Sequence, residues 1–325
     1  MQLSQIHEIK IKSRMITPEN CRSYVEPRAY VFAPPEAKSA KKLPVLYVLA
    51  PWMSAGRELI QWKPFRESFP DRLLRLWKDK EIPECIAVFP DLFTEFGGSQ
   101  YINSSYFGGH ADFIVDELIP EVEKKFPVNQ ERFALGRSSG GFGALRLAMD
   151  FPGVFTGIAC HSGDMGFEQM VRGDLTTLAR GLDRYKGNIS DFIKYCKSAE
   201  KLSPLDTHLL MLLGSCGFYS PNENSKLGYD LPIDLHTAEL HKEVWEKWLE
   251  HDPVRRIDYA RDHLAETKKI YVECGIKDQY NLLYGARQFH AKLKQYEIKH
   301  RYEEFDDNHS ATDYRYDVSL KYLLS

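Results

Sequence analysis

The stretch Phe133-Ala-Leu-Gly-Arg-Ser-Ser-Gly-Gly-Phe-Gly-Ala-Leu145 decides the fold. A short apolar run leads into Gly136-Arg137-Ser138-Ser139-Gly140, and an apolar helical pattern follows it. Only Ser138 fits a G-x-S-x-G pattern, because Ser139 would need a glycine in place of Arg137. Small residues on both sides of the serine permit the tight strand-to-helix turn that lifts its hydroxyl clear of a sheet. The pattern predicts a nucleophile elbow at a helix N-terminus, where the helix dipole favours negative charge. A Gly/Ser-rich turn without chemistry is the alternative.

Apolar runs on both sides of the elbow predict further strands that alternate with helices. The strand-like runs are 43–50, 86–90, 157–160, 269–274 and 300–305, and residues 9–11 and 29–32 indicate an antiparallel lead-in. Near-continuous apolar runs are typical of strands buried on both faces of a parallel sheet. Helical patterns cover 113–126, where Pro120 predicts a kink, and 282–293. This order predicts the α/β class, with a mostly parallel central sheet and antiparallel N-terminal strands.

The segment from about residue 164 to 261 breaks this alternation. It contains a helical pattern that starts near Thr237 and stops at Pro253, and a loop over 217–232 rich in Pro, Asn, Gly and Tyr. An excursion after a sheet strand predicts a helical cap insertion over the carboxyl edge of the sheet, within a single domain of residues 1–325. Such a cap restricts access and shapes a pocket. A solvent-side insertion without a role in the site is the alternative.

Composition and charge exclude several classes of protein. The formal net charge is −3 and like charges do not cluster, so we expect no nucleic-acid or membrane partner. The first ten residues are polar and show no signal peptide, and the longest apolar run is too short to span a bilayer. The six cysteines lack metal-type spacing, and His236 and His241 do not share a helix face. We expect a cytoplasmic protein without a metal or other cofactor.

A nucleophilic serine needs a base and an acid that orients the base. With an elbow of this kind they follow along the chain in the order Ser, Asp or Glu, His. Among eleven histidines, His309 lies just past the last predicted strand, in a loop that would overhang the elbow. Asp278 follows the strand at 269–274 in the same way and is the favoured acid. Asp164, one strand earlier, is the competitor, and spacing alone does not separate the two.

Two main-chain N–H groups are expected to form an oxyanion hole. One belongs to Ser139, directly after the nucleophile, and the other to Trp52, in the loop after the strand at 43–50. Two further loops, 97–106 and 161–165, should line the pocket and bind a polar substrate. Loops that satisfy only their own backbone are the alternative, as is a structural hydrogen-bonding role for the histidine among them. The candidate substrate-binding residues are Gln100, Tyr101, Asn103, His161 and Asp164.

Eight stretches, in order along most of the chain, carry a resemblance to a known family. They are PVLYVL, FPDLFTEFGGSQYINS, DFIVDELIPEVE, GRSSGGFGAL, ACHSGDMGFE, WEKWLEHDPV, GIKDQYNLLYGARQF and DDNHSATDYRY. In these the chain resembles the esterase family of α/β-hydrolases, which includes S-formylglutathione hydrolases, enterochelin esterase-like proteins and feruloyl esterases. The resemblance implies the α/β-hydrolase fold, with Ser138 as nucleophile, Asp278 as acid and His309 as base. The Gly-His-Ser elbow and His-Gly oxyanion loop typical of S-formylglutathione hydrolases are absent, which argues against that activity.

The sequence therefore predicts a serine carboxylic-ester hydrolase that acts through an acyl-enzyme intermediate on a small or polar ester. The expected partner is a small-molecule ester, and a homo-oligomer is left open. An acyltransferase with the same triad is the nearest alternative. A catalytically silent α/β-hydrolase that serves as a scaffold or binding protein is the other, and the complete Ser, Asp and His set argues against it.

Overall fold

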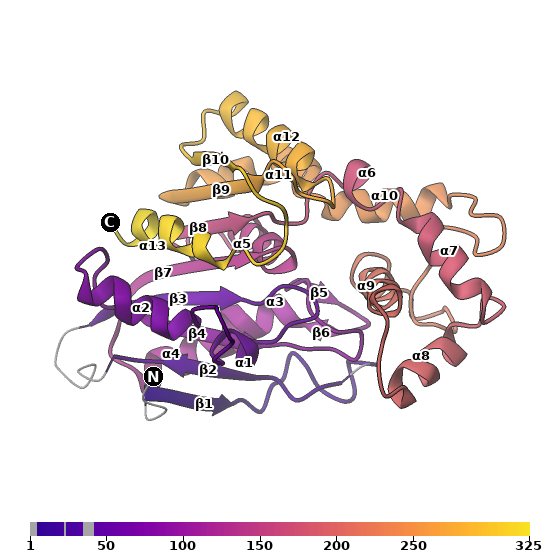
Figure 1. The fold of residues 1–325 in the computed structure, drawn as a ribbon, viewed down its shortest axis with the longest axis horizontal. Coiled ribbons are helices and arrows are strands. Elements are labelled where there is room, and N and C mark those ends of the chain that lie inside the picture. Colours follow the sequence, from indigo (N-terminus) through magenta and orange to yellow (C-terminus); the bar gives the residue numbers. More distant parts are fainter. Residues whose placement is uncertain (1–4, 23, 35–41) are drawn as a thin grey trace.

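The computed structural model describes residues 5–22, 24–34 and 42–325, and its centre is an eight-stranded sheet (Figure 1). The strands lie in the order β1-β2-β4-β3-β7-β8-β9-β10. Their bounds are β1 Ile6–Lys10, β2 Arg28–Phe32, β3 Leu43–Leu49, β4 Ile86–Asp91, β7 Val128–Arg137, β8 Gly157–His161, β9 Lys269–Gly275 and β10 Arg301–Phe305. β2 pairs antiparallel with β1 and β4, and all other pairs are parallel. The predicted mostly parallel sheet with antiparallel N-terminal strands is confirmed.

Helices cover both faces of the sheet, which explains the near-continuous apolar strands. In β3, Val45, Tyr47 and Leu49 face one apolar cluster, whereas Leu46 and Val48 face another. The first cluster includes α4, α5, α11 and α12, and the second includes α2 and α13, which lie on the near side of the sheet in Figure 1. Their bounds are α2 Phe69–Lys78, α4 Ile119–Lys125, α5 Ser139–Asp150, α11 Pro253–Ala265, α12 Leu282–Gln295 and α13 Tyr316–Leu324.

The helix predicted over 113–126 is present, but it is not a simple kinked α-helix. A short α3 (His110–Asp112) runs into a π-helical turn over Phe113–Leu118 and then into α4. The N–H of Ile119 donates to the carbonyl of Ile114, five residues earlier. Pro120 follows directly after this turn in the continuous helix, where it has no N–H to donate. The wider turn therefore accommodates the proline at which a kink was expected.

Five helices between β8 and β9 form a separate group, at the right in Figure 1. They are α6 Phe167–Met170, α7 Leu175–Asp183, α8 Ile189–Ser198, α9 Pro204–Tyr219 and α10 Lys242–His251. They share an apolar cluster with Trp52 and Phe142 of the sheet side. α11 packs instead against α5 and α12, so the expected cap boundary near residue 261 falls within a helix of the main layer. We call the segment 165–251 the cap.

The remaining short elements complete the part of the chain that the structure describes. They are α1 Gly56–Leu59, the two-stranded pair β5 Asn103–Ser104 and β6 Gly108–Gly109, and a 3-10 turn over Asp313–Arg315. Within the described ranges, no helix has the length and apolar character needed to cross a bilayer.

The glycines of the elbow let α5 start directly against the sheet. A Cβ on Gly136 would lie 2.6 Å from the carbonyl oxygen of Leu49 and 2.5 Å from the carbonyl carbon of Gly140. A Cβ on Gly140 would overlap the same Leu49 carbonyl. A Cβ on Gly143 would meet the ring of Tyr101 at 2.6 Å. The carbonyl groups of Leu49 and Gly140 belong to the main chain, so they cannot move aside as a flexible side chain could.

Replacement of Gly140 by alanine is expected to destabilise the protein, because its methyl group overlaps a main-chain carbonyl of β3. Overpacking of this kind costs about 1–3 kcal/mol. Gly173→Ala is the matched control, since no atom lies within 4 Å of a Cβ at that position. Urea unfolding of both variants and the wild type measures the difference. Equal unfolding free energies for the two variants would contradict this account of the elbow.

Candidate active site

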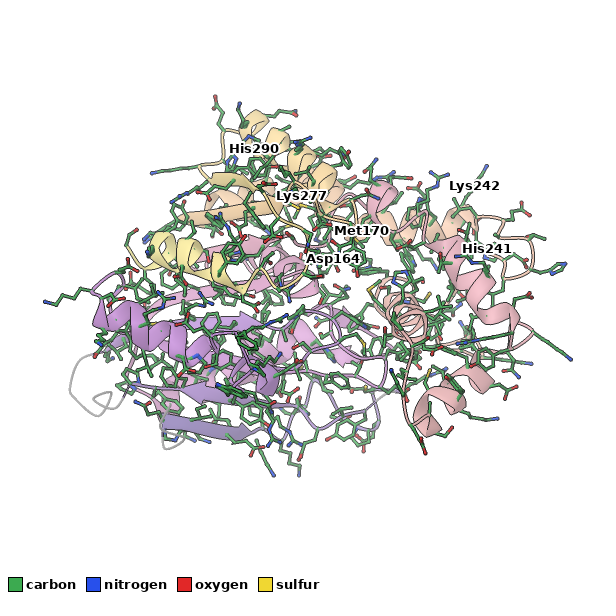
Figure 2. The ribbon with its side chains drawn as sticks, viewed as in Figure 1. Asp164, Met170, His241, Lys242, Lys277 and His290 are labelled. Carbon is green, nitrogen blue, oxygen red and sulfur yellow. The ribbon has the colours of Figure 1, made fainter. Side chains whose placement is uncertain are left out.

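A cavity of about 320 Å³ lies between the carboxyl ends of the parallel strands and the cap. Residues from the sheet side and from the cap both line it, and Figure 2 shows Asp164 and Met170 between the two parts. From the sheet side it is lined by Pro51, Trp52, Met53, Gln100, Arg137, Ser138, Asp164, Tyr280, Leu282 and His309. From the cap it is lined by Met170, Val171, Asp174, Pro204, Thr207, His208, Met211 and Ser215. Of the expected site residues, this cavity brings together Ser138, His309, Trp52, Gln100 and Asp164.

Ser138 has the backbone conformation that a nucleophile elbow requires. Its φ and ψ are 57° and −127°, a strained combination for a residue with a Cβ. Two main-chain hydrogen bonds hold this conformation. The N–H of Ser138 donates to the carbonyl of His161 at 3.0 Å, and its carbonyl accepts from the N–H of Phe142 at 2.9 Å. The serine is thereby fixed between the end of β7 and the start of α5, with its side chain in the cavity.

Asp278 and His309 are in direct contact. His309 Nδ1 lies 2.8 Å from Asp278 Oδ2, and both residues are buried. The other carboxylate oxygen, Oδ1, accepts from the N–H of Tyr280 at 2.9 Å, which fixes the carboxylate. Because Nδ1 is occupied, Nε2 remains as the ring nitrogen that can exchange a proton in the cavity. This is the orientation in which an acid holds the imidazole of a Ser-His-Asp triad.

Arg137, the second residue of the elbow, holds the loop that carries His309. Its Nη1 donates to the main-chain carbonyl of His309 at 2.7 Å, and its Nε lies 4.0 Å from Asp313. The N–H of His309 donates in turn to the side chain of Gln279 at 3.0 Å. The strand that ends just before Ser138 and the loop that carries His309 are therefore tied together directly.

Asp164 contacts the Ser138 hydroxyl and not the Nδ1 atom of His309. Its Oδ1 accepts from the Ser138 hydroxyl at 3.4 Å, and its Oδ2 accepts from Gln100 Nε2 at 3.2 Å. Burial raises the pKa of Asp164 to about 6, against the lowering effect of the Gln100 hydrogen bond and of nearby His309. Of the two competing acids, the one in contact with the imidazole is Asp278.

Tyr101 and Asn103 do not line the cavity. The Tyr101 hydroxyl donates to the carbonyl of Ala50 at 2.8 Å. The Asn103 side chain accepts from the N–H groups of Ala111 and Asp112 at 3.0 and 3.2 Å. Both side chains satisfy main-chain groups around the loop, so the expectation that they bind substrate is corrected, whereas Gln100 of the same loop does line the cavity.

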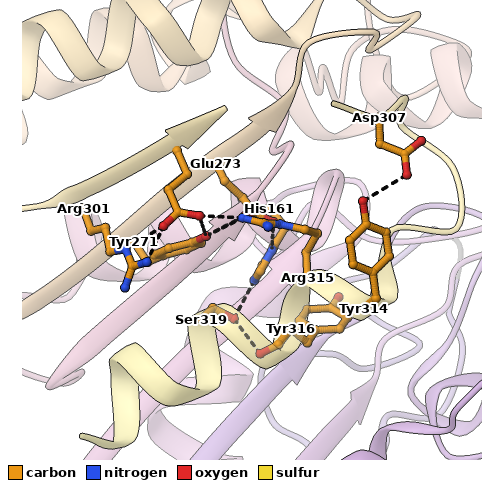
Figure 3. A network of polar contacts seen from close by, with 10 residues as sticks. His161, Tyr271, Glu273, Arg301, Asp307, Tyr314, Arg315, Tyr316 and Ser319 are labelled. Carbon is orange, nitrogen blue, oxygen red and sulfur yellow. Dashed lines mark hydrogen bonds and ion pairs between the residues drawn. The ribbon is translucent and has the colours of Figure 1, made fainter. Parts of the chain in front are cut away.

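His161 is also away from the cavity, in the network of Figure 3. Its Nδ1 lies 2.7 Å from Glu273 and its Nε2 lies 2.8 Å from the Ser319 hydroxyl on α13. Glu273 accepts further bonds from Tyr271 at 2.6 Å and from Arg315 at 2.8 Å. Since both ring nitrogens are used, the expectation that His161 contacts substrate is corrected. The network joins β8 and β9 to α13, directly after the loop that carries His309.

The two expected oxyanion donors lie at the start of α5 and in the cavity wall. Ser139 is the first residue of α5, so its N–H has no carbonyl partner one turn earlier in the helix. Trp52 lines the cavity, and its indole Nε1 donates to the carbonyl of Phe96 at 3.0 Å. The neighbouring N–H of Met53 donates to Gly97 at 2.6 Å. The loop after β3 is therefore held beside the serine, and the two donor roles stay predictions.

Sequence reasoning missed the cap residues of the site. Asp174 and His208 form a pair, with 3.3 Å between Oδ2 and Nε2, in the part of the cavity wall that the cap supplies. The apolar part of this wall is formed by Met170, Val171 and Met211. No local motif marks these positions, because they reach the cavity only through the packing of α7 and α9 over the sheet. The amphipathic pattern of α7 indicates a helix with one buried face, but it does not mark Asp174 or His208.

The fold and the cavity define an α/β-hydrolase. Residues 25–320 match the family described as “Putative esterase”, and the chain belongs to this family. It is a serine esterase, and such enzymes act on small-molecule esters.

Solved structures of similar fold include esterases and related serine hydrolases. One is a ferulic acid esterase, with a TM-score of 0.60 and 18% identity over 98% of this chain and 97% of that chain. Another is the fluorophosphonate-binding serine hydrolase FphF of Staphylococcus aureus, with a TM-score of 0.60 and 15% identity over 98% of both chains. A third is an S-formylglutathione hydrolase from Agrobacterium tumefaciens, with a TM-score of 0.58 and 15% identity over 98% and 94%. None of the curated proteins compared matches the chain.

Replacement of Asp164 by asparagine is expected to stabilise the protein at high pH. Burial raises the pKa of Asp164 from 3.8 to about 6, so the folded state binds this proton more tightly than the unfolded state. The wild type therefore loses stability as the pH rises from about 4 to above 6. Asp164→Asn removes this loss, which is on the order of 3 kcal/mol at pH 8 and vanishes near pH 4.

Urea unfolding at pH 8 and at pH 4 measures this effect. Asp262→Asn is the control, because its carboxylate is 90% exposed and pairs only loosely with Arg261 at 3.8 Å. The prediction would be contradicted if the unfolding free energies of Asp164→Asn and the wild type differed by the same amount at pH 8 and at pH 4.

Proposed function

We propose that the protein hydrolyses a small or polar carboxylic ester through an acyl-enzyme intermediate on Ser138. Asp278 and His309 complete the triad, and no cofactor takes part. The observation that carries this proposal is the strained Ser138 in one cavity with His309, whose Nδ1 is held by Asp278 at 2.8 Å.

The first half-reaction transfers the acyl group to the enzyme. The Ser138 oxygen attacks the ester carbonyl carbon, and His309 Nε2 takes the serine proton. The N–H groups of Ser139 and Trp52 stabilise the negative oxygen of the tetrahedral intermediate. When the bond to the alcohol breaks, His309 returns its proton to the leaving oxygen. Asp278 keeps the imidazole in the required tautomer and stabilises the imidazolium.

Water completes the second half-reaction. His309 takes a proton from the water as it attacks the acyl carbonyl carbon, and the bond to Ser138 breaks with return of that proton to the serine. In the free enzyme the Ser138 hydroxyl donates to Asp164 at 3.4 Å, a long bond that is easily exchanged for one to His309. Catalytic hydrogen bonds of this kind commonly tighten only when substrate is bound.

The cavity supports a small substrate. Its volume of about 320 Å³ is near the lower end of the range for ligand sites. Its acyl-binding wall is supplied by Met170, Val171, Met211 and Leu282, with polar groups at the edges. The ferulic acid esterase and S-formylglutathione hydrolase of similar fold are named for ester and thioester substrates. The cytoplasmic location, the single-domain plan and the choice of water as acceptor remain predictions from the sequence.

Replacement of Ser138 by alanine should abolish turnover, because the acyl group has no oxygen to bond to. Loss of a triad serine costs on the order of 10⁶ in kcat. Hydrolysis of p-nitrophenyl esters from acetate to decanoate measures this, and the small cavity predicts that the short acyl chains react fastest. Ser198→Ala, on the surface of α8, is the control. Substantial turnover by a folded Ser138→Ala enzyme would refute the nucleophile assignment.

Replacement of Asp278 by asparagine should reduce kcat by about 10⁴, because the imidazole is left in the wrong tautomer. The comparison that matters is with Asp164→Asn, since Asp164 touches the serine and not His309 Nδ1. The same short-chain p-nitrophenyl ester serves for both variants, with circular dichroism as a check of folding. If the loss of about 10⁴ fell on Asp164→Asn and spared Asp278→Asn, Asp164 would be the triad acid.

A further inference from the structure

We propose that Asp164 and Gln100 form a subsite for an ammonium group, so that the preferred substrate carries a primary ammonium on the carbon next to the scissile carbonyl. An ester of an α-amino acid has this chemistry. The inference rests on the proposed function, because it places the ammonium relative to an acyl group bonded to Ser138.

The Asp164 carboxylate lies in an environment that favours a bound cation. The residue is only 8% exposed and lines the cavity. Its hydrogen bonds come from the amide of Gln100 at 3.2 Å and from the Ser138 hydroxyl at 3.4 Å. Along the chain that the structure describes, Asp164 forms no ion pair with a lysine or arginine. A buried carboxylate without a cation is costly, and the cost is offset when a cation arrives from the substrate.

A second hydrogen-bond acceptor lies next to this carboxylate. Gln100 is 2% exposed, and its Oε1 is buried without a hydrogen-bond partner. The orientation of the amide follows from its contact with Asp164, because a carboxylate accepts from the NH₂ group and repels the carbonyl oxygen. The subsite therefore offers acceptors and lacks a strong donor of its own. A primary ammonium has three donors and no acceptor, which matches it.

The distance from Asp164 to the serine oxygen fits an ammonium on the carbon next to the acyl carbonyl. When the Ser138 oxygen bonds to the acyl carbon, an α-ammonium nitrogen lies three covalent bonds away, within about 4 Å, since each bond is about 1.5 Å long. Asp164 Oδ1 lies 3.4 Å from that same oxygen. A nitrogen at this position can thus bind the carboxylate while the acyl carbon is attacked.

The charge that develops during the reaction also favours a cationic substrate. The tetrahedral intermediate is negative, and an ionised carboxylate near the serine opposes it. A substrate ammonium between the two removes this repulsion, whereas a neutral substrate does not. Arg137 donates to the His309 carbonyl at 2.7 Å and His208 pairs with Asp174 at 3.3 Å, so neither forms an ion pair with Asp164. The imidazolium of His309 that forms during attack is held at Nδ1 by Asp278. The arrangement therefore predicts a higher kcat/KM for a cationic substrate than for a neutral substrate of the same shape.

The test compares esters that differ in one group. The p-nitrophenyl esters of alanine and of isobutyrate carry NH₃⁺ or CH₃ on the same carbon, and the lactate ester carries OH. Each enzymatic kcat/KM at pH 7 is divided by the rate of the same ester with hydroxide, which removes differences in intrinsic reactivity. We expect the wild type to favour alanine over isobutyrate by at least about tenfold, the effect of 1.4 kcal/mol.

Two variants assign this preference to the subsite. Asp164→Asn should bring the alanine-to-isobutyrate ratio close to one, because the negative charge is lost. Asp174→Asn removes the same charge from the cap wall and should leave the ratio within about threefold of the wild type, a change of less than 1 kcal/mol. The readout is the ratio and not the absolute rate, so a general loss of activity does not imitate the effect.

The outcomes separate this inference from the proposed function. Hydrolysis of all three esters at equal normalised rates by the wild type would overturn the ammonium subsite and leave the esterase mechanism intact. A lactate ester as good as the alanine ester would also overturn it, in favour of a neutral hydroxyl donor. A ratio that survives in Asp164→Asn would place the cation elsewhere. Failure of the folded wild type to hydrolyse any of the three would overturn the proposed function and the subsite together.

Discussion

The close approach of α5 to β3 is the constraint on which the rest of the site depends. Gly136 and Gly140 contact the main chain of Leu49 with no room for a Cβ, so the helix starts directly at the sheet edge. That approach forces Ser138 into its strained turn. Because β3, β7, β8, β9 and β10 are parallel, their carboxyl ends meet at the same edge and bring Trp52, Asp164, Asp278 and His309 to the serine.

Several interactions stabilise this edge of the sheet and offset two destabilising features of the site. The strained serine and the buried Asp164 charge both cost stability, as functional sites commonly do. Arg137 ties the His309 loop to the elbow, and the network of His161, Glu273 and Arg315 ties the segment after that loop to the sheet (Figure 3). Polar groups that do not touch the cavity thus support those that do. The cap packs against the sheet side through the apolar cluster that it shares with Trp52 and Phe142.

The sequence was most informative where a motif and a buried strand coincide. The apolar runs located the strands, and the elbow motif with the strand ends pointed to Ser138, Asp278 and His309, whose side chains the structure brings to one edge. It was less informative for side-chain direction. His161 at the end of β8 turns toward α13, and Tyr101 turns to the carbonyl of Ala50, which depends on register and loop path. Asp174 and His208 reach the cavity only through packing of the cap, which leaves no local pattern.

The most direct test of the central claim is covalent labelling of the nucleophile. An alkyl fluorophosphonate forms a bond from phosphorus to an activated serine oxygen, with loss of fluoride and transfer of the serine proton to the base. Mass spectrometry of the tryptic digest then locates the adduct. The structure predicts one adduct per chain, on the peptide from Ser138 to Arg146, with fragment ions that assign it to Ser138 and not to Ser139. An unlabelled Ser138 in the folded enzyme, or an adduct on a serine outside the cavity, would contradict the account.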